Sequence, residues 1–232
     1  GIPCEIAGDY KLKEGVITSA CLFALENPDS DLRKAAAILL GWLKAESAVK
    51  HLTERLKDQD EEVSGSVQSA LIEIGEASLK PLLSLLSIPE KRARLLAVNA
   101  IGDIGDERAA ESVIAMLSDD DEDIRRAAVS VIAKLKSRKG LSILLNILGD
   151  ESENVRNAAV EAVSSYPMDE ELFGKILGML NSNSPVIRRS AAEVMERSGD
   201  ERALRELEAL LLDDDPTVKQ AAVFALARIE HI

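Results

Sequence analysis

The sequence predicts an all-α fold of tandem helical hairpins, and three observations support this prediction. An acidic turn followed by an amphipathic helix recurs every 30 to 32 residues, a period typical of stacked repeat arrays. No stretch shows the sustained alternation of apolar and polar residues that marks a β-strand. Hydrophobic residues make up 46% of the 232 residues but aromatic residues only 3%. Aliphatic side chains must therefore fill a continuous core.

The recurring helix shows its register in one column of anchor residues. The anchors are Leu32, Val63, Ala93, Ile124, Val155, Ile187 and Val218, and arginine follows most of them. Apolar or small residues recur 3, 4, 7 and 8 positions after each anchor, and these offsets share one face of an α-helix. We therefore predict seven such helices, called B helices here, each preceded by a helix called A.

The ends of the B helices are also visible in the sequence. Three residues before the anchors stand Asp29, Asp60, Glu90, Asp121, Ser152, Ser184 and Asp215. All but the glutamate are good N-caps, because their side-chain oxygens accept from the N–H groups of the first turn. Twelve residues after three of the anchors stand Gly75, Gly105 and Gly199, which we expect to end helices in the left-handed conformation.

The A helices complete the predicted hairpins. We expect them at about residues 10–26, 48–57, 77–86, 108–117, 140–148, 170–180 and 202–212, with Pro81 in the first turn of its helix. No linker or composition break divides the chain, so we predict one repeat domain over residues 1–232. Its repeats span approximately 10–45, 46–76, 77–106, 107–138, 139–168, 169–200 and 201–232.

The charge and the cysteine content limit the classes of partner and the cellular compartment that we expect. The net charge of −13 and pI of about 4.7 argue against nucleic acid and anionic membranes, which attract basic surfaces. No apolar run approaches the roughly 20 residues that span a bilayer, and no secretory signal is visible. We expect a cytoplasmic protein. A disulfide between Cys4 and Cys21 is possible, but we favour free thiols, with Cys21 in the core of a helix.

The turn-and-helix pattern resembles a known repeat. Leu-x-Asp-x-Asp-x-x-Val-Arg-x-Ala-Ala, followed by Gly-Asp-x-Arg-Ala, is similar to the short HEAT repeat of the phycobilisome-lyase type. The match covers about residues 10–232 and is strongest at 117–128, 148–159, 199–203 and 211–222. The resemblance implies a right-handed α-α superhelix, a solenoid of about seven hairpins with B helices lining the concave face. It does not fix a function, because this fold serves many partners.

Two enzyme families share this type of repeat. Deoxyhypusine hydroxylase binds two irons through repeated His-Glu pairs, whereas here His51 precedes Leu52 and His231 precedes Ile232. We therefore expect no such activity, no metal and no cofactor. Bilin lyases of the E/F type offer no compact motif to check. A lyase or lyase-chaperone subunit acting on tetrapyrrole-binding proteins remains an alternative.

The most conspicuous polar feature is a column of arginines directly after the anchors. It comprises Arg33, Arg94, Arg125, Arg156 and Arg188, with Lys219 as a variant. These arginines could bind anions, but we favour a structural ladder in which each one bonds to an acidic turn of an adjacent repeat.

Other candidate sites have simpler explanations. The acidic turns 119–123 and 213–215 lack the loop glycine and distal glutamate of an EF-hand, so we attribute them to capping. His51 should lie at or near the surface. Trp42 and Phe224 could anchor a partner, although we favour packing between repeats for Trp42. No catalytic or phosphate-binding motif occurs.

The predicted function is a non-catalytic scaffold that binds a peptide or protein partner along the B helices. The candidate partner-binding residues, two and six positions after four anchors, are Leu95, Asn99, Arg126, Ser130, Asn157, Glu161, Arg189 and Glu193. The chain could also be a structural module of a larger regulatory protein. Its first and last helices look uncapped, which favours either a longer protein or end-to-end self-association.

Overall fold

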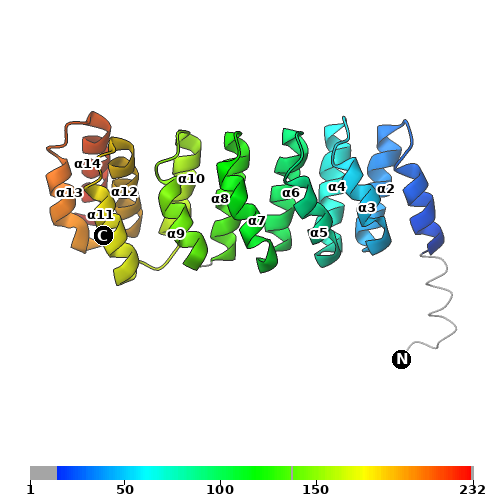
Figure 1. Ribbon diagram of the computed structural model, residues 1–232, viewed down its shortest axis with the longest axis horizontal. Coiled ribbons are helices and arrows are strands. Elements are labelled where there is room, and N and C mark those ends of the chain that lie inside the picture. The colour runs from blue at the N-terminus through cyan, green and yellow to red at the C-terminus, as the bar shows by residue number, and fades with distance from the viewer. Residues whose placement is uncertain (1–14, 137, 231–232) are drawn as a thin grey trace, which may run out of the picture. The chain divides into compact units, whose positions relative to one another are not determined.

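The structure is a computed structural model that describes residues 15–136 and 138–230. Within these residues it contains α-helices and short 3₁₀ helices but no β-strand, which confirms the predicted all-α class. Figure 1 shows successive helical hairpins. The chain divides into two compact units, residues 1–113 and 114–232, with the boundary inside helix α7 (Ala110–Ala115). That the repeats form a single domain stays a prediction.

Unit 1 begins with a helix over residues 15–24, the first A helix. Its B helices are α2 (Ser30–Trp42), α4 (Glu61–Ile74) and α6 (Lys91–Ile104). Its other A helices are α3 (Val49–Arg55), introduced by η1 (Glu46–Ala48), and α5 (Glu76–Leu85), while η2 (Glu107–Ala109) leads into α7. Each B helix packs on the next, and α3 and α5 lie on one side of that layer (Figure 1).

Unit 2 repeats this arrangement. Its B helices are α8 (Glu122–Leu135), α10 (Glu153–Ser164), α12 (Pro185–Ser198) and α14 (Pro216–Glu230). Its A helices are α9 (Arg138–Ile147), α11 (Glu170–Leu180) and α13 (Leu204–Leu210), with η3 (Met116–Ser118) before α8 and η4 (Glu201–Ala203) before α13. As in unit 1, consecutive B helices are in direct contact.

The core follows the predicted stripe of the B helices, except on α2, where Leu32 and Leu39 are exposed. Ile124, Ala128 and Ile132, which lie 0, 4 and 8 positions along the stripe of α8, are all buried. Small residues bring neighbouring B helices close together. A Cβ atom added to Gly41 in α2 would lie 2.8 Å from the Cα atom of Ala70 in α4. The glycine is therefore required by the packing of the two helices.

The predicted N-caps are correct in position, although two do not bond as expected. Asp29, Asp60 and Asp121 accept from first-turn backbone N–H groups through their side chains. Ser152 and Ser184 occupy the cap positions but make no side-chain cap hydrogen bond. In those two turns, as in the aspartate-capped turns, the residue two positions before the cap accepts from the backbone N–H of the cap residue: Asp150 from Ser152 and Ser182 from Ser184.

Three details of the helix boundaries differ from the predictions. Pro81 is the sixth residue of α5, past the first turn, because that helix already begins at Glu76. Gly105 and Gly199 take the left-handed conformation, but Gly75 does not, because its ψ of −128° accompanies a φ of 79°. Lys44 and Lys136, twelve residues after their anchors, have positive φ without being glycine.

Candidate functional site

The ladder arginines hold the turn that precedes their own B helix. Each donates through Nη1 to the backbone carbonyl six residues earlier, at 2.7 to 2.9 Å. These carbonyls belong to Asn27, Ile88, Asp119, Asp150 and Ser182. In these five repeats, one arginine therefore satisfies carbonyl groups of the turn that no helix would pair.

Three of the arginines also reach the next repeat. The Nε and Nη2 atoms of Arg33 donate to both oxygens of Asp58, at 2.8 and 2.9 Å. Arg125 contacts Asp150 and Arg188 contacts Asp213 in the same two-bonded way. This fork-to-fork geometry fixes direction as well as distance. It therefore joins α2, α8 and α12 to the turn of the following hairpin.

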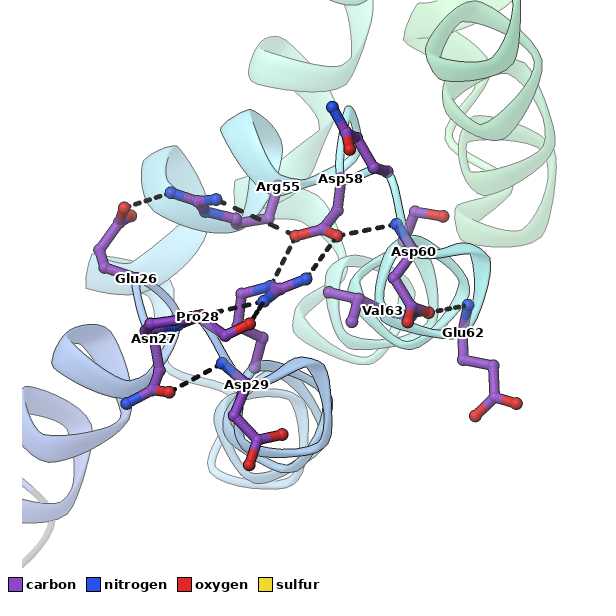
Figure 2. Close-up of polar contacts among 12 residues, drawn as sticks. Glu26, Asn27, Pro28, Asp29, Arg55, Asp58, Asp60, Glu62 and Val63 are labelled. Atoms are coloured by element: carbon purple, nitrogen blue, oxygen red, sulfur yellow. Dashed lines mark hydrogen bonds and ion pairs between the residues drawn. The ribbon is translucent and has the colours of Figure 1, made fainter.

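The aspartates of this ladder have a second partner. Asp58 accepts from the backbone N–H of Asp60, which introduces α4, and Figure 2 shows both this bond and the carboxylate at the centre of the contacts. Burial disfavours the charged form of Asp58, but its bonds to Arg33 and to the backbone outweigh this and lower its pKa. The pKa of Asp213 is lowered chiefly by Arg188.

Arg156 departs from the predicted ladder. It donates to the carbonyls of Asp150 and Glu151 in its own turn. The residue 25 positions later, where Arg33, Arg125 and Arg188 find an aspartate, is Asn181. Without a carboxylate at that position, Arg156 supports its own turn and makes no bond to the next one.

A second ladder runs along the A helices, and the sequence analysis missed its role. In the recurring Gly-Asp-Glu-Arg-Ala segment, Arg108 bonds to Asp106 and to Glu76, the first residue of α5. Arg202 likewise bonds to Asp200 and to Glu170, the first residue of α11. The Arg108 hydrogen bonds lower the pKa of Asp106 to about 2. The signal in the sequence was a glutamate 32 residues before each arginine.

The predicted partner-binding residues lie on four B helices, and five of the eight are exposed. The exposed residues are Asn99 on α6, Arg126 and Ser130 on α8, and Asn157 and Glu161 on α10. Leu95, Arg189 and Glu193 are half-buried. We call the residues two and six positions after the anchors the B-helix surface. In both units this surface lies off the buried stripe, so these side chains are not needed for the core.

Part of the charge on this surface is already neutralised. Arg189 donates to Glu193 at 2.8 Å and to Glu153 at 3.0 Å. Arg126 pairs with Asp123 at 3.4 Å. The middle of the surface in unit 2 is therefore formed by small, neutral side chains, Ser130 and Asn157, with Glu161 beside them.

Trp42 corrects the sequence analysis, which favoured packing between repeats. Its side chain is 74% exposed. The residues at the same offset in the other B helices are polar and exposed, namely Glu73, Asp103, Lys134, Ser165, Arg197 and Arg228. This column faces solvent in every repeat, so Trp42 places a large apolar ring where the repeat normally has a hydrophilic side chain.

The last B helix exposes a face that is covered elsewhere. Val223 is 52% exposed and Phe224 is 54% exposed. In the Val223 column, five of the other six B helices bury their side chain: Ala37, Val98, Val129, Val160 and Ala192. Leu32 and Leu39 on α2 are exposed as well, although their columns are mostly buried. In unit 1 residues of these columns contact a neighbouring repeat: Ala70 lies against Gly41, and Gln68 donates to the carbonyl of Leu96.

The remaining candidates are the two histidines and the two cysteines. His51 is exposed, and residues 15–136 and 138–230 hold no group of three His, Cys, Asp or Glu that could bind a metal. Cys21 is buried, and burial raises the pKa of its thiol. Cys4 and His231 lie outside the described residues. No described helix combines the length and apolar character needed to cross a membrane.

Comparison with known families agrees with the repeat architecture. A family model described as HEAT repeats matches residues 17–72, 69–130, 110–173 and 168–227. These four matches span most of the chain. The chain belongs to the HEAT-repeat family. The resemblance that the turn-and-helix pattern suggested is thereby confirmed.

Solved structures share the solenoid fold at low sequence identity. A mutant of Kap121p is 12% identical with a TM-score of 0.67, and the match covers 93% of this chain and 29% of Kap121p. The protein YibA of E. coli is 16% identical over 97% of both chains, with a TM-score of 0.52. The CpcE–CpcF complex of phycocyanin lyase from Nostoc is 17% identical over 91% of this chain and 94% of that one, with a TM-score of 0.50.

These likenesses show the fold alone. This chain spans less than a third of Kap121p. No curated protein matches the sequence.

Proposed function

We propose that this protein is a non-catalytic scaffold that binds a peptide or protein partner along its B-helix surface. The proposal rests on one observation: different residues of each B helix have different structural roles. The stripe residues fill the core, the ladder arginines join the repeats, and the residues two and six positions after the anchor remain largely exposed. In solenoid proteins, the long surface formed by equivalent residues of successive repeats is the usual binding surface.

The chemistry of this surface suits a polypeptide. Ser130 and Asn157 are exposed, small and able to donate and accept hydrogen bonds, and neither side chain is large enough to hinder a backbone that approaches the helices. Ser130 donates to the carbonyl of Arg126, which leaves its oxygen able to accept. A partner can therefore find hydrogen bonds at repeat spacing without displacing core side chains.

The test compares two double variants that add the same charge to opposite sides of unit 2. Ser130→Arg with Asn157→Arg fills the B-helix surface, whereas Asn146→Arg with Gly174→Arg alters exposed positions on the A helices α9 and α11. Affinity capture from the native lysate is quantified by mass spectrometry for the native chain and both variants. We expect specific proteins to be lost only with the first variant. If the first variant retains them all, or both variants lose them equally, the B-helix surface is not the binding site.

The lyase alternative has its own simple test. A tetrapyrrole held by the protein changes its visible absorbance, so titration of the purified chain with a bilin distinguishes a lyase or lyase chaperone from a scaffold. The scaffold proposal predicts an unchanged bilin spectrum. A saturable spectral shift would support the lyase-type function.

A further inference from the structure

A groove on the A-helix side of unit 1 has features that neither the core nor the two ladders explain. It lies between α3 and α5, which lie side by side in Figure 1. Its cavity volume is about 430 Å³. One wall consists of Lys50, Thr53, Glu54 and Lys57, and the other of Lys80, Pro81, Ser84 and Leu85. On each wall these residues are spaced as one face of a helix, so the groove is formed by two facing helix surfaces.

The floor of the groove is apolar. The hydroxyl of Thr53 donates to the carbonyl of Val49, at 2.7 Å, and the hydroxyl of Ser84 donates to the carbonyl of Pro81. Both hydroxyl protons are therefore bound to carbonyl groups of their own helices and are not available to a ligand. Leu85 and the ring of Pro81 contribute the remaining apolar surface.

The position of Pro81 breaks a local rule of helix formation. As the sixth residue of α5 it cannot donate to the carbonyl of Ala77, and proline inside a helix destabilises it. No stripe or ladder contact accounts for a proline there. Positions that break a local rule without a structural gain are frequently functional. Its ring lines the groove, which is the feature that a proline at this position supplies.

The rim of the groove is positively charged. Lys50, Lys57 and Lys80 are exposed, and among the described residues none of them forms an ion pair. Glu54 is the one carboxylate among the lining residues. Elsewhere the arginines largely bond to carboxylates, as in the neighbourhood of α11 and α13, where Arg188 lines a cavity together with its partner Asp213. Three lysines that form no ion pair among the described residues therefore surround one apolar floor, in a chain of net charge −13.

We propose that this groove binds an acidic peptide segment in which an apolar side chain is flanked by carboxylates. The apolar side chain lies on Thr53, Pro81 and Leu85, and the carboxylates contact the three lysines. Lys50 and Lys57 are two helical turns apart, about 10 Å along the axis. A single head group cannot contact both, whereas carboxylates two or three residues apart in an extended peptide can, at about 3.3 Å per residue. This groove is separate from the B-helix surface, so the proposal does not depend on the proposed scaffold function.

The acidic charge of the whole chain does not prevent this binding. At physiological salt the Debye length is about 8 Å, so distant carboxylates are screened. The ligand therefore interacts mainly with the charges beside it, and these are three lysines and one glutamate.

The test uses a fluorescein-labelled peptide in which a central leucine is flanked by two aspartates on each side. Its binding to the full chain is measured by fluorescence anisotropy. We expect saturable binding at 0.15 M salt that weakens as salt increases. A peptide with asparagines in place of the aspartates, and one with glycine in place of the leucine, should each bind about tenfold more weakly. Equal binding of either control peptide, or no saturable binding of the acidic peptide, overturns the proposal.

A matched pair of variants locates the site. Lys50→Glu with Lys80→Glu should weaken binding of the acidic peptide about tenfold or more. The control is Arg205→Glu with Arg228→Glu, which changes the net charge by the same amount. Both arginines are exposed and make no ion pair among the described residues, and Arg205 lies at the position of its repeat that Lys50 occupies. This control should bind like the native chain, and circular dichroism should show that all variants remain folded. Equal loss of peptide binding in the lysine variant and the arginine control, or no loss in the lysine variant, contradicts the assignment of the site.

One further arm separates a peptide from a small anionic amphiphile. Decanoate presents one carboxylate and a long apolar chain. We expect it to compete poorly, because it can pair with only one of the three lysines. If decanoate displaces the peptide at a similar concentration, the groove is a site for anionic amphiphiles and the peptide proposal is wrong.

Discussion

At the scale of single residues, the ladder arginines connect one repeat to the next through buried or half-buried groups. Arg125 is 6% exposed, and its contact Asp150 lies in the turn that opens the following B helix. A buried guanidinium with a two-bonded carboxylate gives a fixed direction to the contact. Removing one member leaves the other charge without its partner, which costs more than an exposed pair ever contributes.

This contrast predicts the outcome of two adjacent substitutions in α8. Arg125→Ala should reduce the free energy of unfolding by about 3 kcal/mol. The reason is that Asp150 loses its guanidinium partner and the carbonyls of Asp119 and Asp120 lose their hydrogen-bond donor. Arg126→Ala should reduce it by roughly 0.5 kcal/mol at most, because the Arg126 pair is exposed. Urea unfolding of both variants measures the difference. Equal effects would count against a structural ladder.

The lowered pKa of Asp58 predicts a pH dependence. A carboxylate whose folded pKa is depressed stabilises the fold above its unfolded pKa, about 4, and loses this contribution as the pH falls through the folded value. Asp58→Asn should therefore lower the melting temperature at pH 7, and the gap to the native chain should narrow below about pH 4. A gap that is constant from pH 7 to pH 2 would show that the charge of Asp58 does not matter.

At the scale of helices, the close approach of consecutive B helices depends on small residues in defined columns. Gly41→Ala in α2 should destabilise the protein by about 2 kcal/mol, because the new methyl group would overlap Ala70. Gly65→Ala in α4 is the matched control, since no atom lies within 4 Å of the added Cβ. The control should stabilise by about 0.5 to 1 kcal/mol through helix propensity. Thermal unfolding of the two variants measures whether each substitution stabilises or destabilises the protein. Destabilisation by both would refute the packing argument.

The B helices could be predicted from the sequence, and the A helices less well. The 3.6-residue pattern and the acidic caps are local, so the anchors of α8 and α12 and their cap positions are correct. The fourth A helix is a series of η2, α7 and η3, because its short apolar pattern does not distinguish α from 3₁₀ turns. Pro81 shows the same limit of prediction from sequence. The start of α5 depends on Gly75 and not on the preference of proline for the first turn of a helix.

The candidate sites show where sequence reasoning fails. The column of Arg33, Arg125 and Arg188 could be recognised because the period aligns it with acidic turns. The exposure of Trp42 could not be predicted from apolar character, because it depends on which face the next repeat covers. The groove between α3 and α5 combines residues about 30 positions apart whose charges are unremarkable separately.

At the scale of the whole molecule, the exposed end faces suggest that copies stack end to end. Val223 on α14 and Leu39 on α2 occupy columns whose residues contact a neighbouring repeat in unit 1. We expect the apparent mass of the native chain to rise with concentration in light scattering. Val223→Glu with Phe224→Glu should remain monomeric throughout, whereas the exposed control Arg228→Glu should behave like the native chain. A native mass that does not change with concentration would contradict stacking.

Binding along the B-helix surface is tested most directly by site-specific photo-crosslinking in the native lysate. A photoreactive amino acid replaces either Ser130 on α8 or Asn146 on α9, both of which are exposed. Binding along the B-helix surface predicts discrete crosslinked partners from position 130 and none of the same partners from position 146. Crosslinks to those proteins from position 146 alone, or equally from both positions, would contradict it.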